Sequence, residues 1–367
     1  MLFHRLHTDG SRTEVALEDS FAGPAPSACW VIGGGPSLAT LDCEAIARSP
    51  APKMAVNLAG TRLVRPDFWT SYDPSCRFHR SVYLDAGVMK FLHKRRAMEL
   101  VPETTFKVCE CPSTYFFERD KTRGFADLLA PNAKGIVDWA DSLVQAIDIL
   151  YRLGFRALYL AGCEMRVRPS AEQIARAAEF GVEYDPRELL GEFLKKCRRA
   201  SLFDKDLEAV APAAQYHFPE HKPLRSAAHT EEHYFRIANY LRLSRRSLSL
   251  AGMQLISATP DSRLNDWFSY RSVEEVVAEI HATTGDPASE PVEGLYRNPH
   301  DRTPRLAGAM KDYRPPRGLA AAARSPSAPR FSCEPTSARI ELDGELLVEG
   351  EGLLCQRESG WLTRVGQ

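Results

Sequence analysis

The chain has 367 residues, of which 44% are hydrophobic, so it is long enough to bury a full core and to carry an appendage. Its 47 basic and 48 acidic side chains nearly cancel, which argues against a protein that tracks a nucleic-acid backbone. Residues 1–19 contain no apolar signal region, no stretch approaches about 18 apolar residues in a row, and the nine cysteines form no paired framework. We therefore expect a protein of the reducing cytoplasm, without a membrane span or a nucleic-acid partner.

Changes in composition divide the chain into four parts. Residues 1–26 are polar and mixed in charge, and we predict an N-terminal arm there. The core is predicted over 27–282, with a polar, helical cap inserted at about 166–225. Residues 283–330 are rich in Pro, Ala, Arg and Gly and lack apolar periodicity, which predicts a disordered linker. Two strand-like runs around an Asp-Gly pair predict a β-hairpin within 331–367.

Short apolar runs alternate with helical patterns along the core, which predicts βαβ units and a Rossmann-like α/β fold with a mainly parallel sheet. The predicted strands are Cys29–Ile32, Lys53–Asn57, Asp67–Ser71, Thr105–Cys109, Ala157–Ala161 and Met253–Ala258. The clearest helix is predicted over Asp141–Leu153, where apolar residues recur at helical spacing and Gly154 supplies the stop. A second helix, predicted over Ala227–Leu248, leads into the last strand.

Small and polar residues follow these predicted strands. They are Gly33, Gly34, Gly35, Pro36, Ser37, Asn57, Tyr72, Asp73, Cys111–Ser113, Glu164, Thr259, Pro260, Asp261 and Ser262. In an open parallel sheet, ligands bind beyond the carboxyl ends of the strands, because loop amides and helix N-termini converge there. The sequence therefore predicts a site for a nucleotide or a nucleotide-sugar at this edge of the sheet.

The loop Gly33–Ser37 is the most informative of these segments. Three glycines let the backbone turn tightly and bring amide groups against an anion, while Pro36 and Ser37 can begin the next helix. The loop is neither a dinucleotide fingerprint nor a P-loop, because it lacks the third glycine and the lysine that those motifs require. A plain strand-to-helix turn is the alternative interpretation, and the other polar strand ends favour binding.

Carboxylates and histidines supply candidate catalytic groups. Asp73 and Glu164 together could hold Mg²⁺ at a diphosphate, although each alone is more often a helix cap or a ribose partner. Four of the ten histidines fall within residues 216–233, where they could supply metal ligands or a proton-transfer group. These are His217, His221, His229 and His233. A solvated histidine is the alternative interpretation for each of them.

Four ordered segments resemble one enzyme superfamily. Trp30–Leu38 resembles the nucleotide loop of bacterial CMP-sialic acid sialyltransferases and flagellin nonulosonate transferases, and 6-hydroxymethylpterin pyrophosphokinase-like (MptE-like) domains carry a similar loop. Ser71–Ser75 resembles the Tyr-Asn-Pro-Ser turn of the sialyltransferases, with Asp in place of Asn. The helix that begins at Asp141-Ser142 and the strand that ends in Gly162–Glu164 resemble the Ser-Gly helix and the Gly-Ile-Asp strand end of that superfamily. Thr259–Ser262 is similar to its Cys-Pro-Asn-Ser turn.

This resemblance implies a glycosyltransferase-like enzyme that uses a CMP-activated acidic sugar and a glycan or glycolipid acceptor, without a required metal. The glycine loop, Ser142 and the turn Thr259–Ser262 would hold the nucleotide. A histidine near the start of the last core helix, His233 first and His229 second, would be the general base.

Two further readings stay open. The first is an MptE-like diphosphokinase that uses ATP and Mg²⁺ through Asp73 and Glu164. The second is a nucleotide-binding protein without catalysis, because the same two residues depart from the sialyltransferase pattern. Within the cap, Tyr184 and Tyr216 are the counterparts that the resemblance suggests for tyrosines that assist departure of the phosphate.

Overall fold

The computed structural model divides the chain into two compact units, residues 1–314 and 315–367. The described residues are 1–23, 27–57, 59, 63–211, 215–217, 220–284, 332–342, 345–356 and 362–365, and side chains are described except at 215–217, 220–221, 284 and from 332 onward. The predicted linker lies outside the described residues from residue 285 on. Among the helices of the described residues, none combines the length and the apolar character that a membrane crossing requires.

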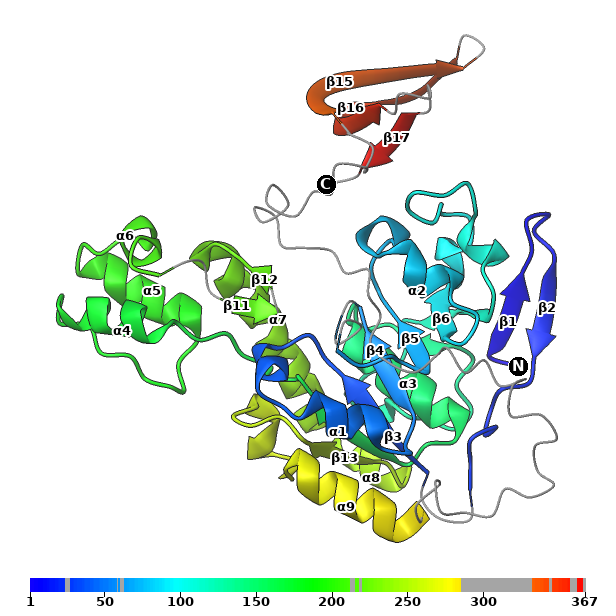
Figure 1. Ribbon diagram of the computed structural model, residues 1–367, viewed down its shortest axis with the longest axis horizontal. Helices are drawn as coiled ribbons and strands as arrows, with labels where there is room; N and C mark the ends of the chain where they lie inside the picture. Colours follow the sequence, from blue (N-terminus) through cyan, green and yellow to red (C-terminus); the bar gives the residue numbers. More distant parts are fainter. Residues whose placement is uncertain are drawn as a thin grey trace. The chain divides into compact units, whose positions relative to one another are not determined.

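A ten-stranded sheet forms the centre of the first unit (Figure 1). In spatial order its strands are β14 (Ser269–Tyr270), β13 (Gln254–Ser257), β10 (Ala157–Ala161), β3 (Ala28–Ile32), β4 (Lys53–Val56), β5 (Phe68–Thr70), β6 (Met89–His93), β7 (Thr114–Phe117), β1 (Phe3–Leu6) and β2 (Arg12–Val15). The strands from β14 to β7 are parallel, and β1 and β2 add an antiparallel edge from within the expected N-terminal arm. The predicted Rossmann-like α/β fold with a mainly parallel sheet is confirmed.

The order of the strands reverses beside β3. From β3 the chain proceeds through β4, β5, β6 and β7 on one side, and it then crosses to β10, which pairs with the other edge of β3. Ligands of open α/β sheets bind at such a reversal, because the loops that leave the two neighbouring strands diverge there. The loops after β3 and β10 are therefore where the fold favours a ligand.

Helices cover both faces of the sheet. The α-helices of the described part of the first unit are α1 (Cys43–Arg48), α2 (Arg80–Leu84), α3 (Ser142–Leu153), α4 (Ala171–Ala178), α5 (Leu190–Arg199), α6 (Asp204–Glu208), α7 (Leu224–Leu243), α8 (Arg245–Leu250) and α9 (Val273–Thr284). Helices α3, α7 and α8 pack on one face, and α1, α2 and α9 pack on the other. Two small sheets pair β8 (Arg119–Asp120) with β9 (Ile136–Val137) and β11 (Gln215–His217) with β12 (Glu220–His221).

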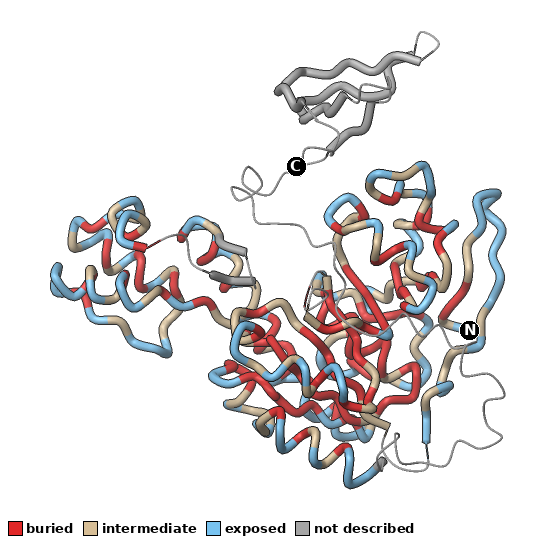
Figure 2. The backbone as a smooth tube through the Cα atoms, viewed as in Figure 1, coloured by how far each residue is buried: buried red, intermediate tan, exposed pale blue. Residues whose placement is uncertain are grey.

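Alternate residues of a strand pack in opposite layers, as the pleated geometry requires. Cys29 and Val31 of β3 pack in the cluster that contains α3, whereas Trp30 and Ile32 pack with α1 and α9. Because both faces are covered, the strands read as continuous apolar runs. Burial is accordingly concentrated in the sheet and the helix faces against it (Figure 2).

The predicted helix over Asp141–Leu153 is confirmed as α3. Asp141 caps it, because one carboxylate oxygen accepts hydrogen bonds from two amides of the first turn, at 2.8 and 3.0 Å. Gly154 ends it in the left-handed conformation, at φ 106°. The start of α3 is therefore fixed by the side chain of Asp141.

The predicted strand Thr105–Cys109 is wrong. The segment is a loop that leads into a 3₁₀ turn, Val108–Glu110, and the strands of this region are instead β6 and β7. Lys90 is the second residue of β6 and is fully buried, with its ammonium group donating to the carbonyl oxygen of Asp85 (2.6 Å). As a consequence, Cys111–Ser113 precede a strand and do not follow one.

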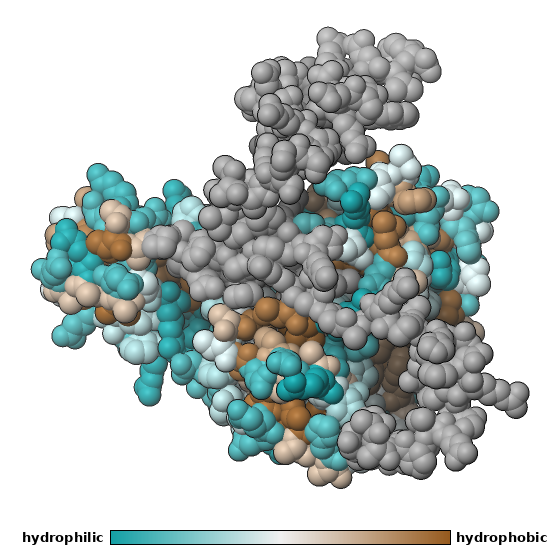
Figure 3. All heavy atoms as spheres, in the orientation of Figure 1, coloured by the Kyte–Doolittle hydropathy of each residue, from teal (hydrophilic) through white to brown (hydrophobic). Residues whose placement is uncertain are grey.

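Helices α4, α5 and α6 and the N-terminal part of α7 form a lobe with its own apolar core, whose members include Phe193, Leu194 and Leu224. The lobe corresponds to the expected cap at about 166–225 and lies beside the sheet (Figure 1). Hydrophilic side chains predominate along its outer edge in the face drawn in Figure 3. Its polar surface and separate core account for the prolines and charges that mark this region of the sequence.

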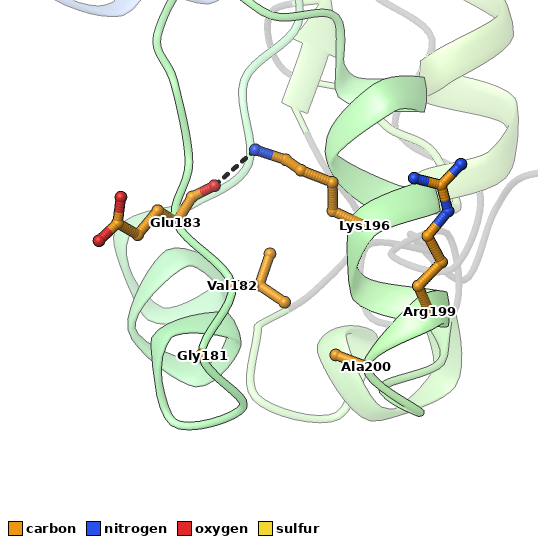
Figure 4. Close-up of a pocket in the computed structure, with 6 residues that line it drawn as sticks. All are labelled: Gly181, Val182, Glu183, Lys196, Arg199 and Ala200. Carbon is orange, nitrogen blue, oxygen red and sulfur yellow. Dashed lines mark hydrogen bonds between the residues drawn. The ribbon is translucent and has the colours of Figure 1, made fainter.

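The lobe holds an open pocket of about 510 Å³ between the loop after α4 and the end of α5 (Figure 4). The lining residues are Gly181, Val182, Glu183, Lys196, Arg199 and Ala200. The Lys196 ammonium group donates to the carbonyl oxygen of Glu183 (2.6 Å) and pairs with Glu188 (2.8 Å). The pocket contains none of the predicted site residues.

The second unit is a three-stranded antiparallel sheet of β15 (Ser332–Leu342), β16 (Glu345–Gln356) and β17 (Leu362–Val365). Leu342, the last residue of β15, pairs with Glu345, the first residue of β16. The predicted hairpin is confirmed, and β17 extends it.

Candidate functional site

The glycine loop is hydrogen-bonded to the loop that follows β10. The Gly33 amide donates to the carbonyl oxygen of Ala161 (2.7 Å), and the Gly35 amide donates to that of Gly162 (2.8 Å). A Cβ at Gly33 would overlap the Gly162 carbonyl group and the Cys163 thiol. Only a glycine lets the two loops approach this closely.

Glu164 fills the space inside the glycine loop. Its carboxylate accepts a hydrogen bond from the amide of Ser37 (2.6 Å), within the short helix η1 (Pro36–Ala39). A Cβ at Gly35 would overlap this carboxylate. Burial raises the pKa of Glu164, and the hydrogen bonds from Ser37 oppose the shift. An acidic group of the chain itself thus occupies the position at which an anion would meet this amide.

In this conformation, the Gly34 amide is the amide of the glycine loop that is available to a ligand. The amides of Gly33, Gly35 and Ser37 all have acceptors, whereas that of Gly34 donates to none of the described residues. Binding of a phosphate by several loop amides would therefore require the Glu164 carboxylate to move.

The turn after β13 is hydrogen-bonded to the end of β10 and to the loop that follows it. The Thr259 hydroxyl donates to the carbonyl oxygen of Leu160 (2.9 Å) and accepts from the amide of Cys163 (3.0 Å). The Ser262 hydroxyl donates to the carbonyl oxygen of Cys163 (2.6 Å). Thr259 and Ser262 are both buried, so their hydroxyls position the loop that carries Glu164. Pro260 and Asp261, between them, are exposed.

A second polar group joins the ends of β4 and β5 to the start of α3. The side-chain oxygen of Asn57 accepts hydrogen bonds from the hydroxyls of Ser71 (2.6 Å) and Ser142 (3.0 Å), and the Ser142 hydroxyl accepts from the amide of Tyr72 (2.8 Å). Asn57 is left-handed at φ 59°, a conformation that asparagine tolerates better than most residues. The structure thus brings Asn57 and Ser142 together, and Ser71 joins them.

Asp73 lies at the edge of this group. Its amide donates to the Ser71 hydroxyl (3.0 Å), and its carboxylate pairs with Arg77 (2.9 Å) near the surface. The other carboxylate of the proposed Mg²⁺ site, Glu164, has the Ser37 amide as its partner. The described residues contain no cluster of three or more His, Cys, Asp or Glu side chains that could hold a metal ion.

Arginines that the sequence analysis did not single out surround Tyr72. The guanidinium group of Arg119 lies 3.5 Å from the centre of the tyrosine ring, and that of Arg95 lies 5.8 Å from it. Arg96 donates to the Tyr72 carbonyl oxygen (3.0 Å). These arginines follow β6 and β7, so they were missed because the two strands were missed. Recognition of Met89–His93 as a strand would have placed Arg95 and Arg96 at the site edge.

A further cation lies where the lobe leaves the sheet. The Nε of Arg166 is buried and has no hydrogen-bond partner among the described residues. Burial lowers the pKa of Arg166, and the charges of Arg168 and Arg263 lower it further. Arg263 pairs with Glu231 (3.0 Å) and Arg168 with Asp261 (3.7 Å), whereas Arg166 makes no ion pair within the described part of the chain. An anionic ligand group would compensate its charge.

His233 and Asp141 form a hydrogen-bonded pair between α7 and the start of α3. The Nε2 of His233 is 3.1 Å from the Oδ2 of Asp141. Because a carboxylate only accepts, Nε2 carries a proton, and in the neutral imidazole Nδ1 then keeps its lone pair. The imidazole is 34% exposed and is therefore accessible to a substrate. Asp141 directly precedes Ser142, so the pair adjoins the polar group at the strand ends.

His229 has a different environment one turn earlier on α7. Its side chain is 84% exposed, and its acidic neighbour is Glu232, at 3.7 Å on the same helix. His217 and His221 lie on β11 and β12, and their side chains lie outside the described residues. Of the four candidate histidines, His229 and His233 have described side chains, and of these two His233 is held at the strand ends and His229 is not.

The two tyrosines of the cap are placed differently. Tyr184 packs edge-to-face on Phe193 in the lobe, with ring centres 5.3 Å apart, and burial raises its pKa. Tyr216 lies on β11, whose backbone contacts η1 next to the glycine loop, and its side chain is outside the described residues. Tyr184 is therefore part of the lobe core.

No protein-family model matches this chain, and no curated protein matches it in sequence. A solved structure with distant similarity is the MAf glycosyltransferase from Magnetospirillum magneticum AMB-1, at 12% sequence identity and a TM-score of 0.35. The alignment covers 73% of this chain and 40% of that chain, so this chain spans less than half the length of that protein. A similarity of this extent carries no argument about function, which must come from the site itself.

Proposed function

We propose that the protein is a glycosyltransferase-like enzyme that transfers a sugar from a nucleotide-activated donor, with His233 as the general base. The observation that carries the proposal is the His233–Asp141 pair, one residue from Ser142. A general base must be accessible, oriented and next to the bound substrate. The partly exposed imidazole and its hydrogen bond at Nε2 meet the first two conditions, and donor binding at the strand ends would meet the third.

In the proposed reaction, the oxygen of an acceptor hydroxyl attacks the anomeric carbon of the donor while its proton passes to Nδ1 of His233. The bond between the anomeric carbon and the phosphate oxygen breaks, and the nucleotide leaves with the bonding electrons. Asp141 keeps the imidazole in the reactive tautomer and stabilises the imidazolium that forms. General base catalysis of this kind contributes on the order of 10²–10⁴ in rate.

A CMP-activated acidic sugar is the donor class that we propose. Such a donor carries two anions, a phosphate and a sugar carboxylate. Arg166 and the exposed Arg95 make no ion pair within the described residues, and both lie at the carboxyl edge of the sheet. They are the cations that would meet these anions, and the acceptor would be a glycan or a glycolipid.

The test compares His233→Asn with His229→Asn, a matched control on the same helix. Nucleotide release by the full chain is measured with CMP-sialic acid, UDP-glucose and GDP-mannose. We expect turnover of the CMP donor, a loss in kcat of roughly 10²-fold or more in His233→Asn with little change in donor KM, and near-normal turnover in His229→Asn.

Near-normal turnover by His233→Asn, or no turnover of any donor by the wild type, would contradict the proposal. Turnover of ATP that strictly requires Mg²⁺ would favour the diphosphokinase reading instead. Nucleotide binding that raises Tm without any turnover would favour a binding protein.

A further inference from the structure

An exposed tryptophan lies on the segment that leads into Asp141. Trp139 is two residues before Asp141, and it is 42% exposed. Its ring stacks on that of Tyr240, with ring centres 4.4 Å apart and planes at 24°. Tyr240 is buried on α7, two turns after His233, so it covers one face of the indole. The part of Trp139 that remains exposed is the surface that a ligand can contact.

The backbone between the tryptophan and the catalytic pair is strained. Ala140 is left-handed, at φ 50°, although it has a Cβ and no side chain that could hydrogen-bond locally. Non-glycine residues in such conformations cluster at functional sites, where surrounding contacts hold them. Here the conformation lets Trp139 stay at the surface while Asp141 caps α3 and contacts His233.

We propose that Trp139, supported by Tyr240, is the platform on which the sugar ring of the acceptor packs. The inference rests on the proposed function, because it assigns the acceptor of that reaction a place. A pyranose has a flat face of C–H groups and a rim of hydroxyls. A flat, half-exposed aromatic ring matches the C–H face. In this proposal a hydroxyl of the acceptor reaches toward Asp141 and His233, two helical turns from Tyr240 along α7.

The platform is tested by binding alone, without a donor. Saturation-transfer difference NMR on the full chain uses methyl β-D-galactopyranoside and methyl α-D-mannopyranoside as probes. We expect the wild type to bind at least one of them, and Trp139→Ala to weaken binding about tenfold or more, as loss of a ring-stacking contact does. Trp139→Phe keeps a ring and should retain most of the binding.

Phe203→Ala is the matched control, because Phe203 is an aromatic residue of the lobe that is 51% exposed and has no place in the proposed site. It should bind the pyranoside like the wild type, and thermal melts establish that each variant is folded. Absence of binding to the wild type, or equal binding by the wild type and Trp139→Ala, would overturn the inference. His233→Asn should bind the pyranoside normally and lose transfer. Normal transfer by His233→Asn would refute the proposed function and leave the platform standing.

Discussion

The glycine loop and the start of α3 lie at the same edge of the sheet, yet their polar groups are used in opposite ways. In the glycine loop, two amides are bonded to the β10 loop and a third to Glu164, so the chain itself satisfies them. At the start of α3, His233 and Trp139 keep exposed surface next to Asp141. A glycine-rich loop can therefore serve the packing of its own fold, while polar and aromatic side chains keep exposed surface at a helix end close by.

The largest effect is expected from Asp141→Asn, which tests whether the start of α3 is a catalytic region. Asparagine caps helices as well as aspartate, so the Tm should change little. Its amide can donate to Nε2 of His233, which moves the imidazole proton to Nδ1 and removes the base. We expect kcat to fall on the order of 10²-fold or more. Steady-state kinetics measure kcat, and thermal melts on the same preparation measure Tm. A kcat near that of the wild type would show that the His233–Asp141 pair is only structural.

The fit between Gly35 and Glu164 is expected to give the next largest effect. In Gly35→Ala the methyl group would overlap the carboxylate, and overpacking of this kind costs about 1–3 kcal/mol of unfolding free energy. In the Glu164→Ala background the same change should cost much less, because the overlapping group is gone. Urea unfolding of the four proteins measures the coupling. Additive costs would mean that the glycine loop does not depend on Glu164.

A loss of stability of similar or smaller size is expected from Thr259→Val. The change keeps the shape of the buried side chain, but it leaves the Cys163 amide without its acceptor, at a cost of about 1–3 kcal/mol. Ser262→Ala should act in the same direction by removing the donor to the Cys163 carbonyl oxygen. Chemical denaturation checks both. Unchanged stability would show that the loop after β10 does not depend on these hydrogen bonds.

The smallest effect is expected from Glu164→Gln and depends on pH. Burial raises the folded pKa of Glu164, so the stability that its protonated form contributes is complete below its ordinary value near 4.5 and is lost as the pH rises through the folded pKa. Glutamine keeps an acceptor for the Ser37 amide without the charge. The variant should therefore melt above the wild type near neutral pH, and the two curves should converge toward pH 4. Parallel melting curves from acid to neutral pH would show that the glycine loop compensates the buried charge.

The sequence predicts those parts of the fold whose signals are local. Asp141 and Gly154 mark the two ends of α3, and the apolar strands on either side of β3 alternate with helices as expected. Strand β6 was missed because Lys90 interrupts its apolar run, and the carbonyl oxygen that accepts from this lysine belongs to another segment. Thr105–Cys109 resembles a strand in composition, but its backbone bonds to residues 97–101 rather than to a strand of the sheet.

The candidate site likewise contains residues that local signals identify and arrangements that depend on long-range contacts. Asn57 and Ser142 were named from a strand end and from the family resemblance, and the structure places their side chains together. That Glu164 would occupy the glycine loop depends on the pairing of β3 with β10, which is a long-range contact. The choice between His233 and His229 depends on which face of α7 meets α3, and helical spacing alone does not determine it.

Asp141 uses one carboxylate oxygen to start a helix and the other to hold an imidazole. The orientation of His233 is therefore set by the same event that folds the first turn of α3, and no separate loop has to close around it. For protein engineering, this means that the pair can be transferred to another scaffold. A designed helix that begins with a capping aspartate needs only a second, neighbouring helix whose histidine lies within hydrogen-bond distance of the free carboxylate oxygen.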